Sequence, residues 1–532
     1  MILPRWPGRR GRAGAAGLGL AGLLAGAGLS QEVDPAAPVA PVALTVRESG
    51  LVIEGDLLGY DGAFYRIETE AGLVTVDGAR VDCRGACPDP GLARLAASGE
   101  AEAADVLMPA LVRAYAASEG LGVRAAEGGL VLSDGGRDVL AVSLTGNGTE
   151  EGFADLLAGE ADMVLARRPV RLLEAALARD AGLGDLADPM RSLVLAPDAL
   201  AAVVSPDGPA RALSLPQLAA IFAGALGDWA ELGAGGGGPV RLHLPDEASA
   251  SAQGFEDAVM EPAGLPVAPA GIVRHADEAD LAAAVAADPG AIGIVRAGLA
   301  GPARPLELGG GCGPAAAPSP FAVASGDYPL SLPLVLYLPA RRLPDAARGF
   351  AAWLASPEAE AAARGAGFGV TADAVPFRAQ ADRLAAGIAA ADAAVLPDLR
   401  EAAAALEGHA RLPETFRFEE GTARLDAAGE SAARRLAARL AAGEFDGRGL
   451  LFAGFSDAAG EADARLSRLR AGVLRDHVVD LAGGTAGATL RAAGFGAALP
   501  VACPDTVWGR NANRRVELWI EEGGPPGRAR GG

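Results

Sequence analysis

The spacing of hydrophobic positions changes along the chain, and each change marks a predicted unit. Residues 42–83 contain short alternating or β-rich runs that are separated by glycine turns, such as those at 48–50 and 60–62. Short strands at this spacing are typical of a small β-barrel or meander. We therefore expect a small β-rich domain over residues 42–88.

Helical and extended patterns alternate over residues 95–378. Helical spacing occurs at 104–116, 152–159 and 215–222, and apolar strand-like runs occur at 139–144, 162–166 and 200–204. This alternation predicts an α/β architecture with largely parallel sheets. Ser214 directly precedes the third of these helices, and Pro216 stands in its first turn, so we expect Ser214 to be its N-cap.

The chain then becomes alanine-rich and helical over residues 379–411, which predicts a helical linker. Residues 412–521 form the last predicted unit. Its strands are expected at 415–418, 450–455, 490–494 and 515–520, and its helices at 427–442 and 462–481. In the second helix, Leu466, Leu469 and Val473 form an apolar stripe that we expect to face the core. Residues 522–532 are expected to be a disordered tail.

The amino-terminal segment has the pattern of a secretion signal. Arginines precede an apolar stretch at 13–29, and small residues lead to a plausible cleavage point near Ser30. We expect residues 1–30 to be a signal peptide and the mature protein to be periplasmic. A retained membrane helix is the alternative, but the stretch is short and interrupted by glycine.

Composition excludes several kinds of chemistry. The formal net charge of −21 disfavours binding to nucleic acid through a bulk electrostatic field. The chain contains no lysine, so neither a Walker loop nor a Schiff-base lysine is present. Its four histidines lie far apart, without metal or triad spacing. We expect no cofactor, no metal site and no enzymatic activity.

Four cysteines fit an oxidising compartment. Cys83 and Cys87 are close enough in sequence for a local disulfide, which would support a small domain with little core. Cys312 and Cys503 are either paired with each other or free. The spacing does not match a zinc pattern.

The strongest candidate site lies in the last unit. Asp457 follows a predicted strand, and Arg470 lies on the next predicted helix, on the same face as Asp463 and Ser467. A carboxylate near a guanidinium suits a zwitterionic ligand, because the carboxylate holds an ammonium group and the guanidinium takes a carboxylate by two hydrogen bonds.

Three ordered motifs in this unit resemble the OmpA-like peptidoglycan-binding domain. They are S-D-A-A-G at 456–460, D-A-R-L-S-R-L-R-A at 463–471 and G-R-N-A-N-R-R-V-E at 509–517. The resemblance implies that Asp457 and Arg470 grip the diaminopimelate of the wall peptide. Asn513 and Arg514 complete the candidate wall-binding set; Asn511 and Asn513 are expected to shape the loop through backbone hydrogen bonds. Arg514 and Arg515 alternate faces of a strand, so only one of them faces the ligand.

The middle region resembles phosphate-type (PstS-like) periplasmic binding proteins, in which two α/β lobes close on a ligand. The resemblance lies in segments 107–112, 159–163, 213–229 and 289–293. By position, the candidate ligand residues are two arginines and three serines: Ser98, Arg167, Arg168, Ser249 and Ser251. Phosphate or another oxyanion, a different small ligand, and a degenerate scaffold all remain open.

Together these features predict an α/β multidomain protein with a small β-unit, a two-lobed clamshell and a C-terminal α/β sandwich. We expect an exported, peptidoglycan-tethered solute-binding protein that captures or senses a small oxyanion, phosphate by resemblance. The alternative is a structural cell-wall linker, in which the solute-binding-like domain is degenerate and binds an envelope protein partner.

Overall fold

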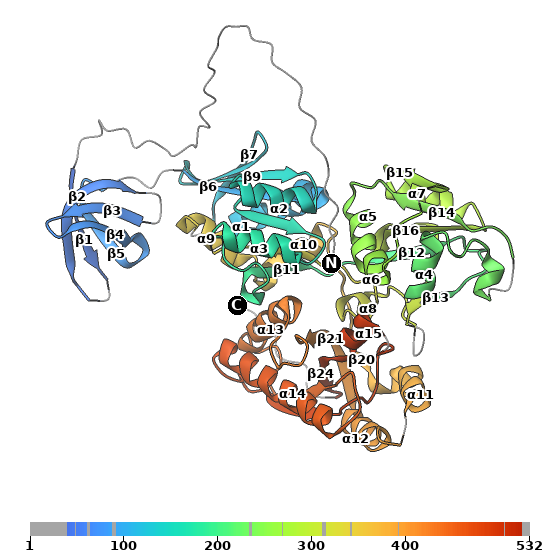
Figure 1. Cartoon of the computed structure of the whole chain (residues 1–532). Helices are drawn as coiled ribbons and strands as arrows, with labels where there is room; N and C mark the ends of the chain where they lie inside the picture. Colours follow the sequence, from blue (N-terminus) through green and yellow to red (C-terminus); the bar gives the residue numbers. More distant parts are fainter. Residues whose placement is uncertain are drawn as a thin grey trace, which may run out of the picture. The chain divides into compact units, whose positions relative to one another are not determined.

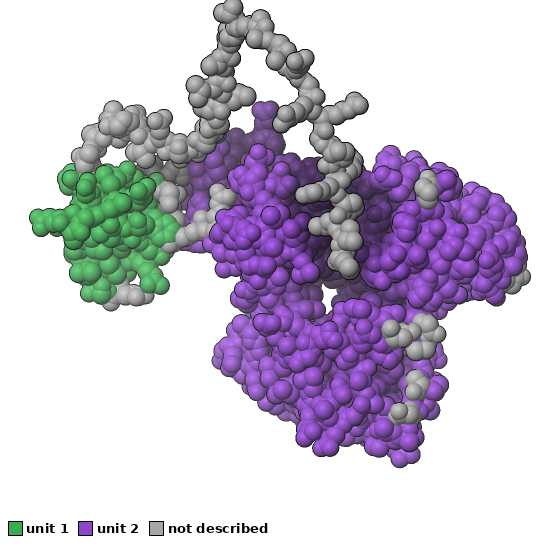
Figure 2. Space-filling model, viewed as in Figure 1, with its two compact units in different colours: residues 1–60, 64–88 green, residues 61–63, 89–532 purple. Residues whose placement is uncertain are grey.

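The computed structural model describes residues 40–523, apart from 48, 61–63, 88–91, 234–236, 269, 311–314, 341–342, 392 and 505. The chain divides into two compact units, one of residues 1–60 and 64–88 and one of residues 61–63 and 89–532 (Figure 2). The predicted signal peptide and residues 524–532 of the predicted tail lie outside the described residues. Among the described residues, no helix is long and apolar enough to cross a membrane.

The first unit is a five-stranded antiparallel sheet in the order β4-β3-β2-β1-β5. Its strands are β1 (Ala40–Val46), β2 (Val52–Tyr60), β3 (Phe64–Thr69), β4 (Gly72–Asp77) and β5 (Val81–Gly85). One face is buried around Leu44 and Ile67. A disulfide joins Cys83 and Cys87, as predicted. The β-rich prediction for this segment is therefore confirmed.

The second unit begins with a seven-stranded sheet in the order β11-β19-β10-β6-β9-β8-β7. Figure 1 labels its strands β6, β7, β9 and β11. Its strands are β6 (Ala93–Gly99), β7 (Gly122–Ala126), β8 (Gly129–Asp134), β9 (Arg137–Gly146), β10 (Met163–Ala166), β11 (Ser192–Ala196) and β19 (Leu334–Tyr337). The helical elements of this first lobe are η2 (Ala103–Leu107), α1 (Met108–Ser118), α2 (Thr149–Ala158), α3 (Leu172–Asp180), η3 (Pro189–Arg191), α9 (Asp345–Trp353) and α10 (Pro357–Gly365).

A second lobe follows, built on a five-stranded sheet in the order β15-β14-β16-β12-β17. Its strands are β12 (Leu200–Val204), β14 (Arg241–Pro245), β15 (Ile272–His275), β16 (Ala291–Arg296) and β17 (Arg304–Pro305), with a separate pair β13 (Ala212–Ser214) and β18 (Glu307–Gly309). Its main helical elements are α4 (Leu215–Phe222), α5 (Ala250–Phe255), η5 (Glu256–Met260), α6 (Glu261–Ala263), α7 (Glu278–Ala286) and α8 (Pro320–Ala324). Ser214 caps α4 by accepting a hydrogen bond from Gln217 N, as predicted.

The expectation of largely parallel sheets is wrong. In the first lobe β6 pairs in parallel with β9 and β10, but β7, β8 and β9 form antiparallel hairpins and β19 runs antiparallel to both of its neighbours. Only short glycine-containing turns join β7 to β8 and β8 to β9, and such turns reverse the chain direction. The sheets are therefore mixed.

The C-terminal domain is a five-stranded sheet in the order β20-β21-β24-β22-β23. Its strands are β20 (Val375–Pro376), β21 (His409–Arg417), β22 (Gly449–Gly454), β23 (Thr489–Gly494) and β24 (Arg515–Glu521). Its helices are α11 (Ala381–Ala390), α12 (Leu396–Leu406), α13 (Ala427–Ala441), α14 (Glu461–Ala482) and α15 (Val507–Asn513). The segment predicted as a linker contributes α11 and α12, and Leu399 and Leu406 of α12 pack with Trp519 of β24 in one hydrophobic cluster.

The predicted core face of α14 is wrong. Leu469 and Val473 are 55% and 42% exposed, and the buried face instead carries Ala464, Ser467, Arg470, Ala471, Leu474 and Val478. The reason is the close approach of the helix to β22. A Cβ atom at Gly454 would lie 2.1 Å from the carbonyl oxygen of Ser467 and 3.3 Å from Cβ of Ala471, so the face that carries Ser467 and Ala471 lies against the strand.

A buried carboxylate holds the centre of the C-terminal sheet. Glu517 of β24 accepts hydrogen bonds from Arg383 at 2.5 Å, Arg515 at 2.7 Å and Trp519 Nε1 at 3.1 Å, and Arg411 Nε lies 3.4 Å away. Burial alone would raise the pKa of Glu517, but the three guanidinium groups outweigh burial and hold this pKa well below its ordinary value. The charge is therefore stable only while its partners surround it.

The same network reaches the second lobe of the clamshell. Arg411 donates to Asp327, which follows α8, at 2.5 Å, and Arg417 donates to the carbonyl oxygens of Ser325 and Gly326 at 3.1 and 2.6 Å. The first lobe is contacted separately by α13. Ser431 Oγ accepts a hydrogen bond from Val194 N of β11 at 3.0 Å. One C-terminal domain thus contacts both lobes.

Replacing Glu517 with Gln should lower the free energy of unfolding of this unit by about 3–5 kcal/mol near neutral pH, because buried guanidinium groups lose their counter-charge. The folded pKa of Glu517 lies below its unfolded value of 4.5, so its stabilising contribution is present above that value and is lost as the pH falls. The variant should therefore also show a weaker loss of stability on acidification. Urea denaturation followed over a series of acidic pH values measures both effects.

Glu521→Gln is the matched control. Glu521 lies on the same strand but is half exposed, and it pairs with Arg491 at 3.0 Å. Such a pair contributes at most about 1 kcal/mol. Equal losses in the two variants would show that Glu517 is not the central charge of this sheet.

Candidate functional site

The three candidate serines of the clamshell are all engaged within the chain. Ser98, near the end of β6, lies 2.5 Å from Asp155 Oδ2 and 3.0 Å from Asn147 Oδ1. Ser249 Oγ accepts a hydrogen bond from Ala252 N and so caps α5. Ser251 Oγ donates to Glu278 Oε1 at 2.6 Å. These hydroxyls therefore already have partners in the structure described.

Arg167 follows β10 and is almost completely buried. Its guanidinium contacts Asp198 directly, and lies 3.3 Å from Glu100 and 3.4 Å from Glu102. Burial lowers the pKa of Arg167, but these carboxylates outweigh it and raise the pKa overall. The guanidinium is thus charged and surrounded by acceptors from its own chain.

Arg168, the next residue, is also held by carboxylates of the chain. Its two terminal nitrogens donate to the Glu174 carboxylate at 2.8 and 2.6 Å, and Nε lies 3.5 Å from Asp257. The guanidinium also lies over the ring of Phe153, 5.4 Å from its centroid. Arg167 and Arg168 are consecutive in the sequence, but their side chains belong to two different ion-pair clusters.

Sequence reasoning missed the acidic partners and a third arginine. Arg296, the last residue of β16, contacts Glu102 directly, and its Nη2 lies 3.1 Å from Asp198 Oδ2. Glu100 and Glu102 follow directly after β6, where the carboxyl ends of parallel strands gather polar side chains. Their position after a buried strand is the sequence signal that could have identified them.

The C-terminal candidate residues do come together. Asp457 follows β22, and its Oδ2 pairs with Arg514 Nη1 at 3.0 Å. Burial and then the charge of Arg514 lower the pKa of Arg470, and the nearby charge of Asp457 opposes them only in part. Arg470 of α14 and Arg514, which directly precedes β24, therefore both lie near the carboxylate of Asp457.

Arg470 makes fewer hydrogen bonds than its side chain allows. It is fully buried, its Nε donates to Thr422 O at 2.8 Å, and its guanidinium lies 5.3 Å from the centroid of the Phe418 ring. Both terminal nitrogens, Nη1 and Nη2, are buried without a hydrogen-bond partner among the described residues. An arginine presents five donors, so most of the donor capacity of this side chain is unused.

The two asparagines differ in role. Asn513 Oδ1 accepts hydrogen bonds from Val501 N and Ala502 N, and its Nδ2 donates to Ala502 O at 2.7 Å, so it shapes the loop before α15. Asn511 Oδ1 accepts from Arg514 Nη2. The segment predicted as a loop is helix α15, which Thr506 caps through Gly509 N. Cys503 is disulfide-bonded, whereas Cys312 lies outside the described residues.

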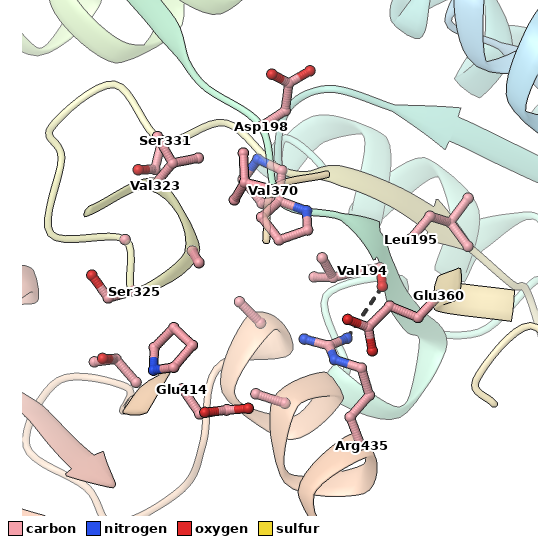
Figure 3. Close-up of a pocket in the computed structure, with 18 of the residues that line it drawn as sticks. Val194, Leu195, Asp198, Val323, Ser325, Ser331, Glu360, Val370, Glu414 and Arg435 are labelled. Atoms are coloured by element: carbon pink, nitrogen blue, oxygen red, sulfur yellow. Dashed lines mark hydrogen bonds between the residues drawn. The ribbon is translucent and has the colours of Figure 1, made fainter. Parts of the chain in front are cut away.

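A cavity of about 790 Å³ lies where the C-terminal domain contacts the two lobes (Figure 3). Val194 and Leu195 of the first lobe, Val323 and Ser325 of the second lobe, and Arg435 of α13 line it. Figure 3 shows Arg435 directed across this space toward β11, where its Nη1 donates to Val194 O at 3.2 Å. Opposite charges line the cavity, so it has no single electrostatic character.

Comparison with known proteins identifies one part of the chain. Residues 136–358 match the family model of the PBP superfamily domain. No curated protein matches the chain.

Several solved structures are similar to about half of the chain. An ABC-type phosphate transport receptor from Vibrio cholerae has 21% identity and a TM-score of 0.41, over 52% of this chain and 100% of that protein. PstS from Borrelia burgdorferi has 15% identity and a TM-score of 0.39, over 53% and 100%. A phosphate-binding protein from Stenotrophomonas maltophilia has 14% identity and a TM-score of 0.32, over 52% and 91%. Such low values assign no ligand to this chain, which is a mixed α/β protein with a PBP-like domain.

Proposed function

We propose that this chain is an exported protein that its C-terminal domain holds non-covalently to the cell wall, and that it carries a clamshell of the solute-binding type. Three ordered motifs that resemble the OmpA-like domain support the first part. The match to the PBP superfamily domain over residues 136–358 supports the second. The signal-peptide pattern of residues 1–30 supports export.

The observation that carries the wall-binding proposal is that both terminal nitrogens of Arg470 are buried without a hydrogen-bond partner among the described residues. Leaving a buried donor without an acceptor costs about 1–3 kcal/mol, and more for a charged group. A buried donor of this kind calls for a partner, such as a water, an ion or a ligand. A carboxylate that accepts from both terminal nitrogens of Arg470 would give each of them a charged partner.

The surroundings of Arg470 suit a zwitterion. Asp457 supplies a carboxylate for an ammonium group, and its present partner Arg514 is also held by Asn511. An incoming ammonium could therefore share Asp457 without leaving Arg514 unpaired. The free end of diaminopimelate carries an ammonium and a carboxylate on one carbon, which fits this pair of opposite charges.

Solute capture by the clamshell is the second candidate activity. An oxyanion such as phosphate would need Arg167 or Arg168, and each of these already meets carboxylates of its own chain. This observation gives weight to the alternative in which the clamshell is a scaffold for an envelope protein partner. Calorimetry with phosphate and sulfate on the full chain distinguishes the two roles.

Replacing Arg470 with Met should leave the free energy of unfolding within about 1 kcal/mol of the original, or raise it, because the change removes buried unpaired donors. Arg515→Met is the control, since Arg515 is equally buried but pairs with Glu517 and Leu499 O. We expect that variant to lose about 3–5 kcal/mol. Urea denaturation measures both; similar losses would show that Arg470 has a structural partner.

The proposed tether predicts co-sedimentation with purified peptidoglycan of the diaminopimelate type. Binding should fall at least about tenfold in Asp457→Asn and in Arg470→Met, since each loses one charged contact of a few kcal/mol. Peptidoglycan of the lysine type, whose side chain lacks the second carboxylate, should bind as weakly as the variants do. Free diaminopimelate should compete.

Arg468→Ala is the matched control for the tether, because this arginine is exposed on the same helix, two residues from Arg470. Its binding should equal that of the unchanged protein. Full binding by both site variants would refute the assigned site, and equal binding to the two wall types would refute recognition of a zwitterion.

A further inference from the structure

Arginines from the two lobes of the clamshell lie close together. Arg167 follows β10 in the first lobe, and Arg296 ends β16 in the second lobe. Both guanidinium groups contact Asp198, which lies in the connection between β11 and β12 where the chain passes from one lobe to the other. Two guanidinium groups from opposite lobes that converge on one point offer charge-assisted hydrogen bonds to an anion placed there.

A second carboxylate of the chain, that of Glu102, also contacts both of these arginines. Glu102, which precedes η2 in the first lobe, contacts Arg296 of the second lobe directly and lies 3.4 Å from Arg167 Nη2. It thereby bridges the two lobes through their arginines. Its geometry is that of a monodentate anionic ligand accepting from donors on both sides of the cleft.

A second ion-pair cluster also crosses between the lobes. Asp257 of η5, in the second lobe, accepts a hydrogen bond from Arg171 Nη2 at 2.7 Å and lies 3.5 Å from Arg168 Nε. Both arginines belong to the first lobe, and Arg168 is held in place by Glu174. The lobes are therefore joined by two sets of ion pairs.

The formal charge of the ion-pair cluster around Arg167 and Arg296 determines which ions can bind to it. Two guanidinium groups, of Arg167 and Arg296, face three carboxylates, of Glu100, Glu102 and Asp198, so the cluster has a formal charge of −1. A phosphate or sulfate ion added to this cluster would be repelled. Removing one carboxylate makes the cluster neutral and leaves Arg296 with unused donors.

Among the three carboxylates, that of Glu102 is the one that can move away from the two arginines. Its side chain is 43% exposed, whereas those of Glu100 and Asp198 are 9% and 15% exposed. Glu100 Oε2 also accepts a hydrogen bond from Ala103 N, and Asp198 Oδ1 accepts one from Ala199 N. Glu102 makes no side-chain hydrogen bond to the helix that it precedes.

We infer that Glu102 acts as an internal ligand of the clamshell: its carboxylate takes the place of an oxyanion between Arg167 and Arg296 and keeps free oxyanions out of the cleft. Glu102 is thus the residue that sets the specificity of this cleft. The inference does not depend on the wall-binding site, which lies in another domain.

The test measures phosphate and sulfate binding by the full chain and by Glu102→Gln and Glu102→Ala. Isothermal calorimetry gives the affinity, and the shift of the melting temperature at millimolar anion gives a second readout. We expect no binding by the unchanged protein. Both variants should gain affinity by at least about tenfold, because removal of the carboxylate both relieves repulsion and frees donors of Arg296.

Glu150→Gln and Asp257→Asn are the matched controls. Glu150 is an exposed acid of the same lobe, 3.9 Å from Arg171, and its replacement changes the net charge equally without freeing Arg167 or Arg296. Asp257→Asn removes the other interlobe contact but leaves Glu102 in place. Neither control should gain oxyanion binding.

Two outcomes would overturn the inference. Tight phosphate or sulfate binding by the unchanged protein would show that Glu102 does not block the cleft. Absence of a gain in both Glu102 variants, when they melt within a few degrees of the unchanged protein, would show that its carboxylate does not replace an anion. Because Glu102 is half exposed and caps no helix through its side chain, both variants are expected to fold.

Discussion

The constraint on which this structure depends is that a buried guanidinium must meet an acceptor. The chain contains no lysine, so arginine supplies all of its long cationic side chains, and several of these are buried. Arg411 and Arg515 meet Glu517 in the C-terminal sheet, and Arg167 meets three carboxylates in the clamshell. Among the described residues, the guanidinium of Arg470 donates to a carbonyl oxygen and lies over an aromatic ring, and both of its terminal nitrogens lack a hydrogen-bond partner. The paired guanidinium groups hold elements together, whereas Arg470 keeps most of its donors unused.

The same constraint connects the domains of the second unit. Arg411 reaches Asp327 of the second lobe, while Arg435 and Ser431 of α13 bond the backbone of β11 in the first lobe. Each contact buries a charged or polar donor against an acceptor that belongs to another domain. Loss of such a contact would leave both partners unsatisfied, so these contacts favour one arrangement of the C-terminal domain on the clamshell.

Comparison of the two candidate sites shows that two buried arginines can have different surroundings. Arg167 and Arg470 are both nearly or fully buried, and both were candidates for binding an anion. Carboxylates of the chain surround Arg167, so an external anion must compete with them. No carboxylate bonds the terminal nitrogens of Arg470 among the described residues, so an external carboxylate would meet no competitor there. The acceptors around a cation, and not the cation alone, decide whether it is available to a ligand.

The sequence by itself determined the elements and the order of the units. Helix and strand positions in the clamshell, the cap at Ser214, the β-rich first unit and the Cys83–Cys87 disulfide follow from local periodicity and spacing, which act between near neighbours. Only the tertiary structure decided which face of α14 is buried, because the close approach of Gly454 to Ser467 turns the face of Ser467 toward β22 and leaves Leu469 exposed. It also decided the pairing of each arginine. Glu102 and Arg296 are 194 residues apart in the chain, and no local pattern indicates that folding brings their charges together across the cleft.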